Sequence, residues 1–130
     1  MLSMGRGRIT RRWESVPLMR LIKMRIYLSG KITGREKEDY TKQFARAETF
    51  YKTGGFDVVN PVKIGEEVLK INPKAEWQDF MIRDLEALRT CTHIALLEGW
   101  EESKGAKTEK AEAEKLGLEI MQLKFIGGKK

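Results

Sequence analysis

The sequence holds very little cysteine and histidine. Cys91 is its one cysteine and His93 its one histidine. A lone cysteine cannot form an internal disulfide, and one residue of each type cannot supply the four ligands of a typical zinc site. We therefore expect no metal and no other cofactor, and a reducing, cytoplasmic setting. Both residues are expected to be structural, Cys91 as a small buried side chain and His93 at the end of a strand.

Long apolar runs are also missing. No stretch approaches the roughly 18 apolar residues of a transmembrane helix, and the N-terminus lacks the continuous apolar core of a signal peptide. We expect no membrane association. The 41% hydrophobic and 34% charged residues are instead typical of a folded domain, and 130 residues suffice for one domain with its own core.

Positive charge is concentrated at one end of the chain. Residues 1–23 carry six lysines and arginines against one acid, Glu14, and so hold +5 of the net charge of +6. Residues 24–130 are left with +1, which argues against a basic nucleic-acid-binding patch on the fold. We expect residues 1–23 to be a flexible basic extension, able at most to bind phosphate weakly. Met24, an alternative start, opens the domain of residues 24–130.

Strand-like and helix-like segments alternate after Met24. Helical spacing is clearest at Tyr40, Phe44, Ala47 and Tyr51. The predicted strands are residues 25–29, 56–60, 92–98 and 118–125; the predicted helices are 36–53, 74–89 and the segment after Gly105; residues 62–72 are predicted as a loop with a short helix. This order predicts a doubly wound α/β domain with a mostly parallel four-stranded sheet and helices on both faces.

In such folds, ligands bind beyond the carboxyl ends of the strands. That rule selects residues 30–35, 60–61 and 99–109. The first of these places Gly30 and Gly34 between a strand and a helix, where backbone amides can approach an anion. It matches neither the Walker loop nor the dinucleotide-binding pattern, and taken alone such a glycine turn is more often a plain turn than a binding site.

Two carboxylates have unusual predicted positions. Asp84 falls in the apolar stripe of the helix 74–89, which is costly unless the group has a partner or a function. A loop cap or a lysine partner would also explain it. Glu109 lies on the small-residue face between Ala106 and Ala113, although a carboxylate near a helix start is also favourable electrostatically. Four other glutamates are expected in solvent, and two tryptophans are expected mainly to pack: Glu101, Glu102, Glu112 and Glu114; Trp77 and Trp100.

Three stretches, taken in order, carry a family resemblance. They are IYLSGKITGRE (26–36), FMIRDLEALRTCTHIALLEG (80–99) and SKGAKTE (103–109). Together they resemble the nucleoside 2-deoxyribosyltransferase superfamily. The likeness is greatest to its 2′-deoxynucleoside 5′-monophosphate N-glycosidases and to small phage-associated relatives.

The resemblance implies cleavage or transfer at the N-glycosidic bond of deoxynucleotides or deoxynucleosides. Glu109 would be the nucleophile that forms a covalent deoxyribosyl intermediate, and Asp84 would orient the sugar and help to protonate the departing base. Ser103 stands where pure nucleoside transferases carry an acid, which favours a nucleotide. The implied phosphate-binding residues are Gly30, Lys31, Ile32, Gly34, Ser103 and Gly105. The resemblance also implies a homodimer or larger homo-oligomer, because a neighbouring subunit completes the site in the family.

The sequence also departs from the family. Thr108 precedes the implied nucleophile where an aromatic residue is common, and the family's chain continues past the fourth strand. These departures imply a more open site or a loss of efficient turnover. Two other functions remain open: a non-catalytic nucleotide-binding or sensor module on the same fold, and a nucleic-acid-binding accessory protein that acts through residues 1–23.

Overall fold

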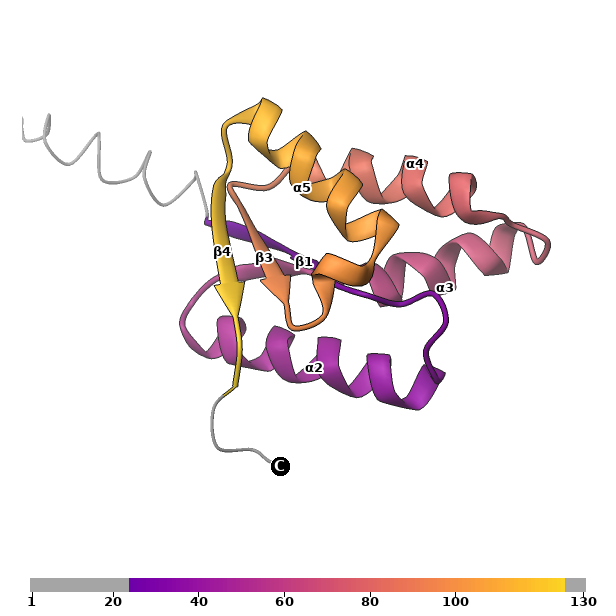
Figure 1. Ribbon diagram of the computed structural model, residues 1–130, viewed down its shortest axis with the longest axis horizontal. Coiled ribbons are helices and arrows are strands. Elements are labelled where there is room, and N and C mark those ends of the chain that lie inside the picture. The colour runs from indigo at the N-terminus through magenta and orange to yellow at the C-terminus, as the bar shows by residue number, and fades with distance from the viewer. Residues whose placement is uncertain (1–23, 126–130) are drawn as a thin grey trace, which may run out of the picture.

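The computed structural model describes residues 24–125, and the predicted extension 1–23 lies outside them. The described residues form four strands and four α-helices, with two consecutive helices between the second and third strands (Figure 1). The strands are β1 (Arg25–Ser29), β2 (Asp57–Val59), β3 (His93–Leu97) and β4 (Glu119–Leu123). The helices are α2 (Lys37–Thr53), α3 (Pro61–Ile71), α4 (Trp77–Leu88) and α5 (Lys104–Leu116), and a short 3₁₀ helix, η1 (Trp100–Glu102), precedes α5.

All strand pairs in the sheet are parallel, and the strand order is β2-β1-β3-β4. Helix α2 covers one face, and α3, α4 and α5 cover the other (Figure 1). The predicted doubly wound α/β fold is therefore confirmed. None of the helices in residues 24–125 is long and apolar enough to cross a membrane.

The central strand β1 is buried on both faces. Ile26 and Leu28 point to α2, where Phe44 completes a hydrophobic cluster. Tyr27 points to the opposite face, into a cluster with Leu88 and other apolar residues of α4, β3 and α5. Successive side chains of a strand alternate between faces, so a central parallel strand needs apolar residues at nearly every position.

Helix α3 corrects the prediction for residues 62–72. The segment is a full helix of 11 residues rather than a loop with a short helix. Asn60 caps it, since its Oδ1 accepts a hydrogen bond from the backbone N–H of Val62 at 3.0 Å. Pro61 occupies the first helical position, where its missing N–H costs nothing. Gly65 faces the Phe80 ring of α4.

Helix α4 begins at Trp77, three residues after the predicted start at Lys74. A capping box sets this boundary: the backbone N–H of Glu76 donates to Asp79 Oδ2 at 2.8 Å, and the Glu76 side chain caps Asp79 in return.

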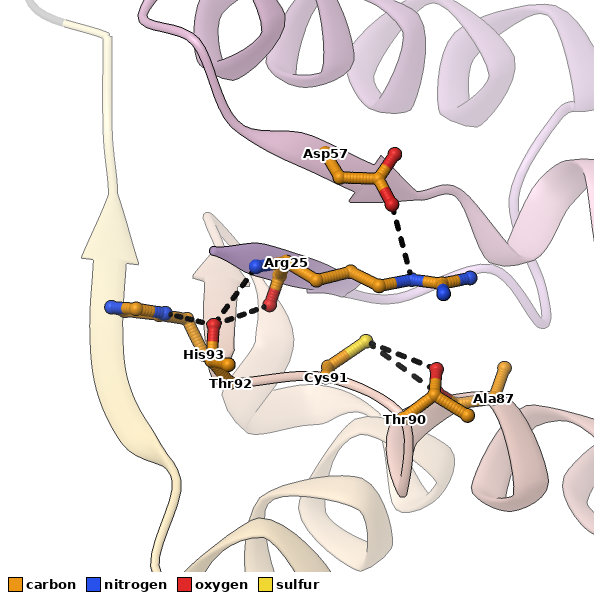
Figure 2. Close-up of polar contacts among 7 residues, drawn as sticks. All are labelled: Arg25, Asp57, Ala87, Thr90, Cys91, Thr92 and His93. Carbon is orange, nitrogen blue, oxygen red and sulfur yellow. Dashed lines mark hydrogen bonds and ion pairs between the residues drawn. The ribbon is translucent and has the colours of Figure 1, made fainter. Parts of the chain in front are cut away.

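The amino ends of the strands hold a separate polar cluster (Figure 2). Arg25 pairs with Asp57 at 3.5 Å, and Cys91 Sγ donates to the carbonyl of Ala87 at 3.4 Å. Cys91 is buried and His93 opens β3, as predicted. His93 Nδ1 lies 2.6 Å from Thr92 Oγ1 (Figure 2).

Candidate functional site

The strand order places the switch point between β1 and β3. From β1 the chain passes to β2, which neighbours β1 along one edge. It later returns to β3, which neighbours β1 along the opposite edge. Helix α2, after β1, and helix α5, after β3, lie on opposite faces (Figure 1). The loops that leave β1 and β3 therefore diverge, which is where ligands bind in doubly wound folds.

Two carboxyl groups are buried beneath these loops. Glu109 of α5 is 5% exposed and Asp84 of α4 is 9% exposed. The predicted inward positions of both residues are confirmed. Glu109 accepts two hydrogen bonds, on Oε2 from the Tyr27 hydroxyl and on Oε1 from Ser29 Oγ, each at 2.7 Å. Both hydroxyl donors are completely buried in β1.

The two carboxyl groups also contact each other. Burial, with the neighbouring Glu109, raises the pKa of Asp84 to about 8. Burial raises the pKa of Glu109 to about 7, although hydrogen bonds from Ser29, Tyr27 and Asp84 oppose this rise. Burial therefore keeps the pair partly protonated into the neutral pH range. The two hydroxyl donors favour the charged form of Glu109, whereas no such donor favours the charged form of Asp84 in the described chain.

Tyr27 remains a donor at any ordinary pH. Burial raises its pKa well above the usual value, and the nearby carboxylates raise it further. The lysine partner that would have given Asp84 a purely structural explanation is not found, because no ion pair within residues 24–125 involves Asp84. Nor does this part of the chain hold a group of three or more potential metal ligands.

Packing alone explains part of the sequence of the first predicted binding loop, residues 30–35. A Cβ atom on Gly30 would lie 3.1 Å from the Phe44 ring and 3.2 Å from Leu97 Cβ. Gly34 adopts a φ of +84°, a backbone conformation that favours glycine. Ile32 packs on the α2-side core. The glycines are thus required by the turn whether or not a ligand binds.

The second loop begins α5 next to α4. Ser103 caps the helix, since its Oγ accepts a hydrogen bond from the backbone N–H of Ala106 at 3.0 Å and keeps its own proton for donation. Gly105 faces Met81 and Trp77 of α4. The Lys104 ammonium lies 4.3 Å from the centre of the Trp77 ring. The contact between α4 and α5 thus continues from the carboxyl pair toward the start of α5.

One ion pair joins the two loops, between Lys31 Nζ and Glu102 Oε1 at 3.4 Å. In addition, Gln43 Nε2 of α2 donates to the carbonyl of Glu98, just after β3, at 3.0 Å. Glu102 is exposed, as predicted for Glu101, Glu102 and Glu114. The prediction for Glu112 is wrong: it is half-buried and pairs with Arg89 at 3.2 Å, because α5 turns that side toward the end of α4.

Tyr27 and Ser29 were not among the predicted site residues. The strand RIYLS itself could have indicated them, because Tyr27 and Ser29 are two positions apart and so point to the same face of the sheet. A buried tyrosine hydroxyl and a buried serine each require a hydrogen-bond partner. Two such groups on one face of a central strand indicate a polar group opposite them.

Two hollows on the surface of residues 24–125 lie away from the carboxyl pair. One lies on the outer side of α5 around Lys104, Lys107 and Lys115, and another lies beside α2 around Arg46 and Phe125. Both are open and exposed, whereas perturbed carboxyl groups at a switch point have a chemical reason to be functional. We therefore regard the pair as the candidate site.

Fold and site together define a doubly wound α/β domain with a buried, proton-sharing carboxyl pair at its switch point. Residues 24–122 match the family described as "domain of unknown function (DUF4406)", and the chain belongs to that family. All four residues of the carboxyl cluster lie within the matched region: Tyr27, Ser29, Asp84 and Glu109. No curated protein and no solved structure matches the chain significantly.

Proposed function

We propose that the protein cleaves or transfers at the N-glycosidic bond of 2′-deoxynucleotides or deoxynucleosides, in the manner of the nucleoside 2-deoxyribosyltransferases. The observation that carries this proposal is the buried Glu109–Asp84 pair, in which hydroxyl groups donate hydrogen bonds to both oxygens of Glu109 but to neither oxygen of Asp84. Displacement at an anomeric carbon needs those two groups: a nucleophile, and an acid for the leaving group.

In the proposed reaction, the Glu109 carboxylate attacks C1′ of the deoxyribosyl group. The C1′–N bond breaks, its electron pair leaves with the base, and the Asp84 proton neutralises the base. Water or a second base then attacks C1′, breaks the glycosyl ester and restores the Glu109 carboxylate. The proton of the attacking group returns to Asp84. Tyr27 and Ser29 hold the carboxylate in place through both steps.

A nucleotide is the preferred ligand in this proposal. Ser103 is uncharged and retains a hydroxyl proton, and it lies at the amino end of α5, where the helix dipole favours an anion. Lys31 supplies a cation from the first loop. The proposed 5′-phosphate site consists of the two loops that the resemblance implied: Gly30, Lys31, Ile32, Gly34, Ser103 and Gly105.

We also propose that the protein forms a homo-oligomer and works in the cytoplasm. On α4, Met81 is buried and Phe80 is half-buried, so neither offers a large apolar surface to a second copy of the chain. Ile82 is 57% exposed on α4, and Ile71 is 75% exposed at the end of α3.

The buried, lone Cys91 suits a reducing compartment such as the proposed cytoplasm.

One observation favours a second candidate, a non-catalytic nucleotide-binding module. Glu109 is 5% exposed, and both of its oxygens already accept hydrogen bonds. A ligand at the loops could therefore bind without reaching the carboxylate. This alternative predicts nucleotide binding without chemistry.

Base release distinguishes the two candidates. The unmodified protein is incubated with each of the four common deoxynucleoside monophosphates, and free base is measured by chromatography. We expect release by the unmodified protein and a loss of about 10³-fold or more in Glu109→Gln. Glu101→Gln, on the exposed loop, is the matched control and should retain activity. Binding without release would favour the second candidate; full activity in Glu109→Gln would contradict the mechanism.

A further inference from the structure

The two buried carboxyl groups are chemically alike, but their surroundings differ. Glu109 accepts a hydrogen bond from a hydroxyl on each oxygen, at 2.7 Å in both cases. Within the described residues, Asp84 interacts with Glu109 but receives no hydrogen bond from a hydroxyl, amide or cation. The negative charge of the pair is therefore stabilised on one side only.

Ser29 is the donor whose presence packing does not explain. Tyr27 fills part of the core with its ring and belongs to the hydrophobic cluster beneath α4 and α5. Ser29 is completely buried and makes one side-chain hydrogen bond in the described chain, to Glu109. A buried hydroxyl without a partner is unfavourable, so the carboxylate is the reason for a serine here.

We infer that Ser29 is a positioning residue that fixes Glu109, and not Asp84, as the charged member of the pair. Its hydroxyl stabilises the carboxylate form of Glu109, which leaves the shared proton on Asp84. The catalytic meaning of this role rests on the proposed function: nucleophile and acid are assigned before a substrate arrives. Among the hydrogen bonds that lower the pKa of Glu109, that of Ser29 has the largest effect.

Few other groups can influence which of the two carboxyl groups is charged. The titratable groups that face Glu109 are Tyr27 from β1 and Asp84 from α4. The neighbouring strand β3 presents Ile94 and Leu96 to the same cluster. Cys91 is near enough to raise the pKa of Tyr27, but it does not contribute to the pKa of Glu109.

The test follows the two carboxyl groups directly. The full chain is labelled with ¹³C at the side-chain carboxyl carbons of aspartate and glutamate, and its NMR spectrum is recorded against pH. Asp84→Asn and Glu109→Gln assign the two signals. In the unmodified protein, Glu109 should show most of the change in the lower titration step and Asp84 most of the change in the upper step.

Ser29→Ala should redistribute the charge. The lower step should rise by about one pH unit or more, because a hydrogen bond to the charged form is lost, and Asp84 should take a larger share of it. Ser29→Cys, of similar volume but with a weaker donor, should show a smaller shift in the same direction. It also serves as the test should Ser29→Ala fail to fold.

Tyr51→Phe is the matched control, since it removes a hydroxyl from the opposite face of the sheet and should leave both steps unchanged. Folded Ser29 variants with unchanged titration steps would overturn the inference. The titration needs no substrate. A protein that releases no base would therefore contradict the proposed function, but the effect of Ser29 on the charge of Glu109 could still be measured.

Discussion

Asn60 Nδ2 donates a hydrogen bond to Glu48 Oε1 at 3.0 Å, and so ties α2 to the start of α3. Lys52 and Lys63 pair with the other oxygen of Glu48, at 2.8 Å and 3.0 Å. Burial raises the pKa of Glu48, but the hydrogen bonds from Lys52, Asn60 and Lys63 outweigh it and lower that pKa to about 2.

Glu48 should therefore stabilise the fold above acidic pH. Its folded pKa lies below the unfolded value of 4.5, so its contribution is present above pH 4.5 and is lost as the pH falls toward 2. We expect roughly 1–3 kcal/mol, discounted because both lysines are exposed. Urea denaturation of Glu48→Gln should show a smaller loss of stability over this range than the unmodified protein. An identical acid dependence in the two proteins would contradict this role.

The carboxyl pair should have the opposite effect on stability. The folded pKa values of Asp84 and Glu109, about 8 and about 7, lie above the unfolded values. The folded protein thus binds protons that the unfolded chain has released, and this contribution is lost as the pH rises from about 4 to about 8. Denaturation curves of Asp84→Asn should decline less steeply over that range. An equally steep decline would show that other groups cause it.

A charge at Ser103 should reverse the ligand preference. The unmodified protein should bind deoxynucleoside monophosphates more tightly than the corresponding nucleosides, as measured by calorimetry. Ser103→Asp keeps a helix-capping oxygen but repels a phosphate, so the order should reverse. Ser103→Asn, which caps without a charge, is the control and should keep the original order. Equal affinity for both ligands in the unmodified protein would exclude the phosphate from the site.

Gly30 should tolerate no larger side chain. A methyl group there would meet Phe44 and Leu97 at 3.1 Å and 3.2 Å, inside the core of the α2 face. Gly30→Ala should reduce the free energy of unfolding by about 1–3 kcal/mol through overpacking. Gly34→Ala meets open space and should cost about 1 kcal/mol through its positive φ alone. Thermal denaturation of both variants measures the two losses of stability. A Gly30→Ala variant as stable as the unmodified protein would contradict the close packing.

The exposed isoleucines should mark the contact between copies of the chain. We expect light scattering at micromolar concentration to show a dimer or larger species. Ile82→Lys, on α4, should shift the population toward monomer, because a charge in an apolar interface is unfavourable. Leu116→Lys, at the end of α5, is the control and should have little effect. A strict monomer in the unmodified protein would contradict self-association.

The sequence predicted the elements that depend on local pattern. Periodic apolar residues located the four strands and three of the four long helices, and the inward positions of Asp84 and Glu109 follow from the same spacing. Helix α3 was underestimated although its apolar residues recur at helical spacing, and Asn60 as the cap with Pro61 at the first position already marks its start.

The contacts of the site depend on distant parts of the chain. Tyr27 and Ser29 are separated from Glu109 by 82 and 80 positions. Their meeting requires the strand order and the placement of α5 over β1, neither of which local periodicity specifies. The sequence could therefore indicate which carboxyl groups point inward, but not which hydroxyls receive them.

The Thr92 hydroxyl clamps both backbone groups of Arg25. Its Oγ1 accepts from the Arg25 N–H at 2.9 Å and donates to the Arg25 carbonyl at 3.1 Å. The alignment of β1 against β3 is thus fixed by a side chain inside the domain, at the first residue of the strand. A tag, a fusion partner or a surface tether joined at Met24 would pull on a strand that is already anchored. The carboxyl cluster at the other end of β1 should keep its geometry under such attachment.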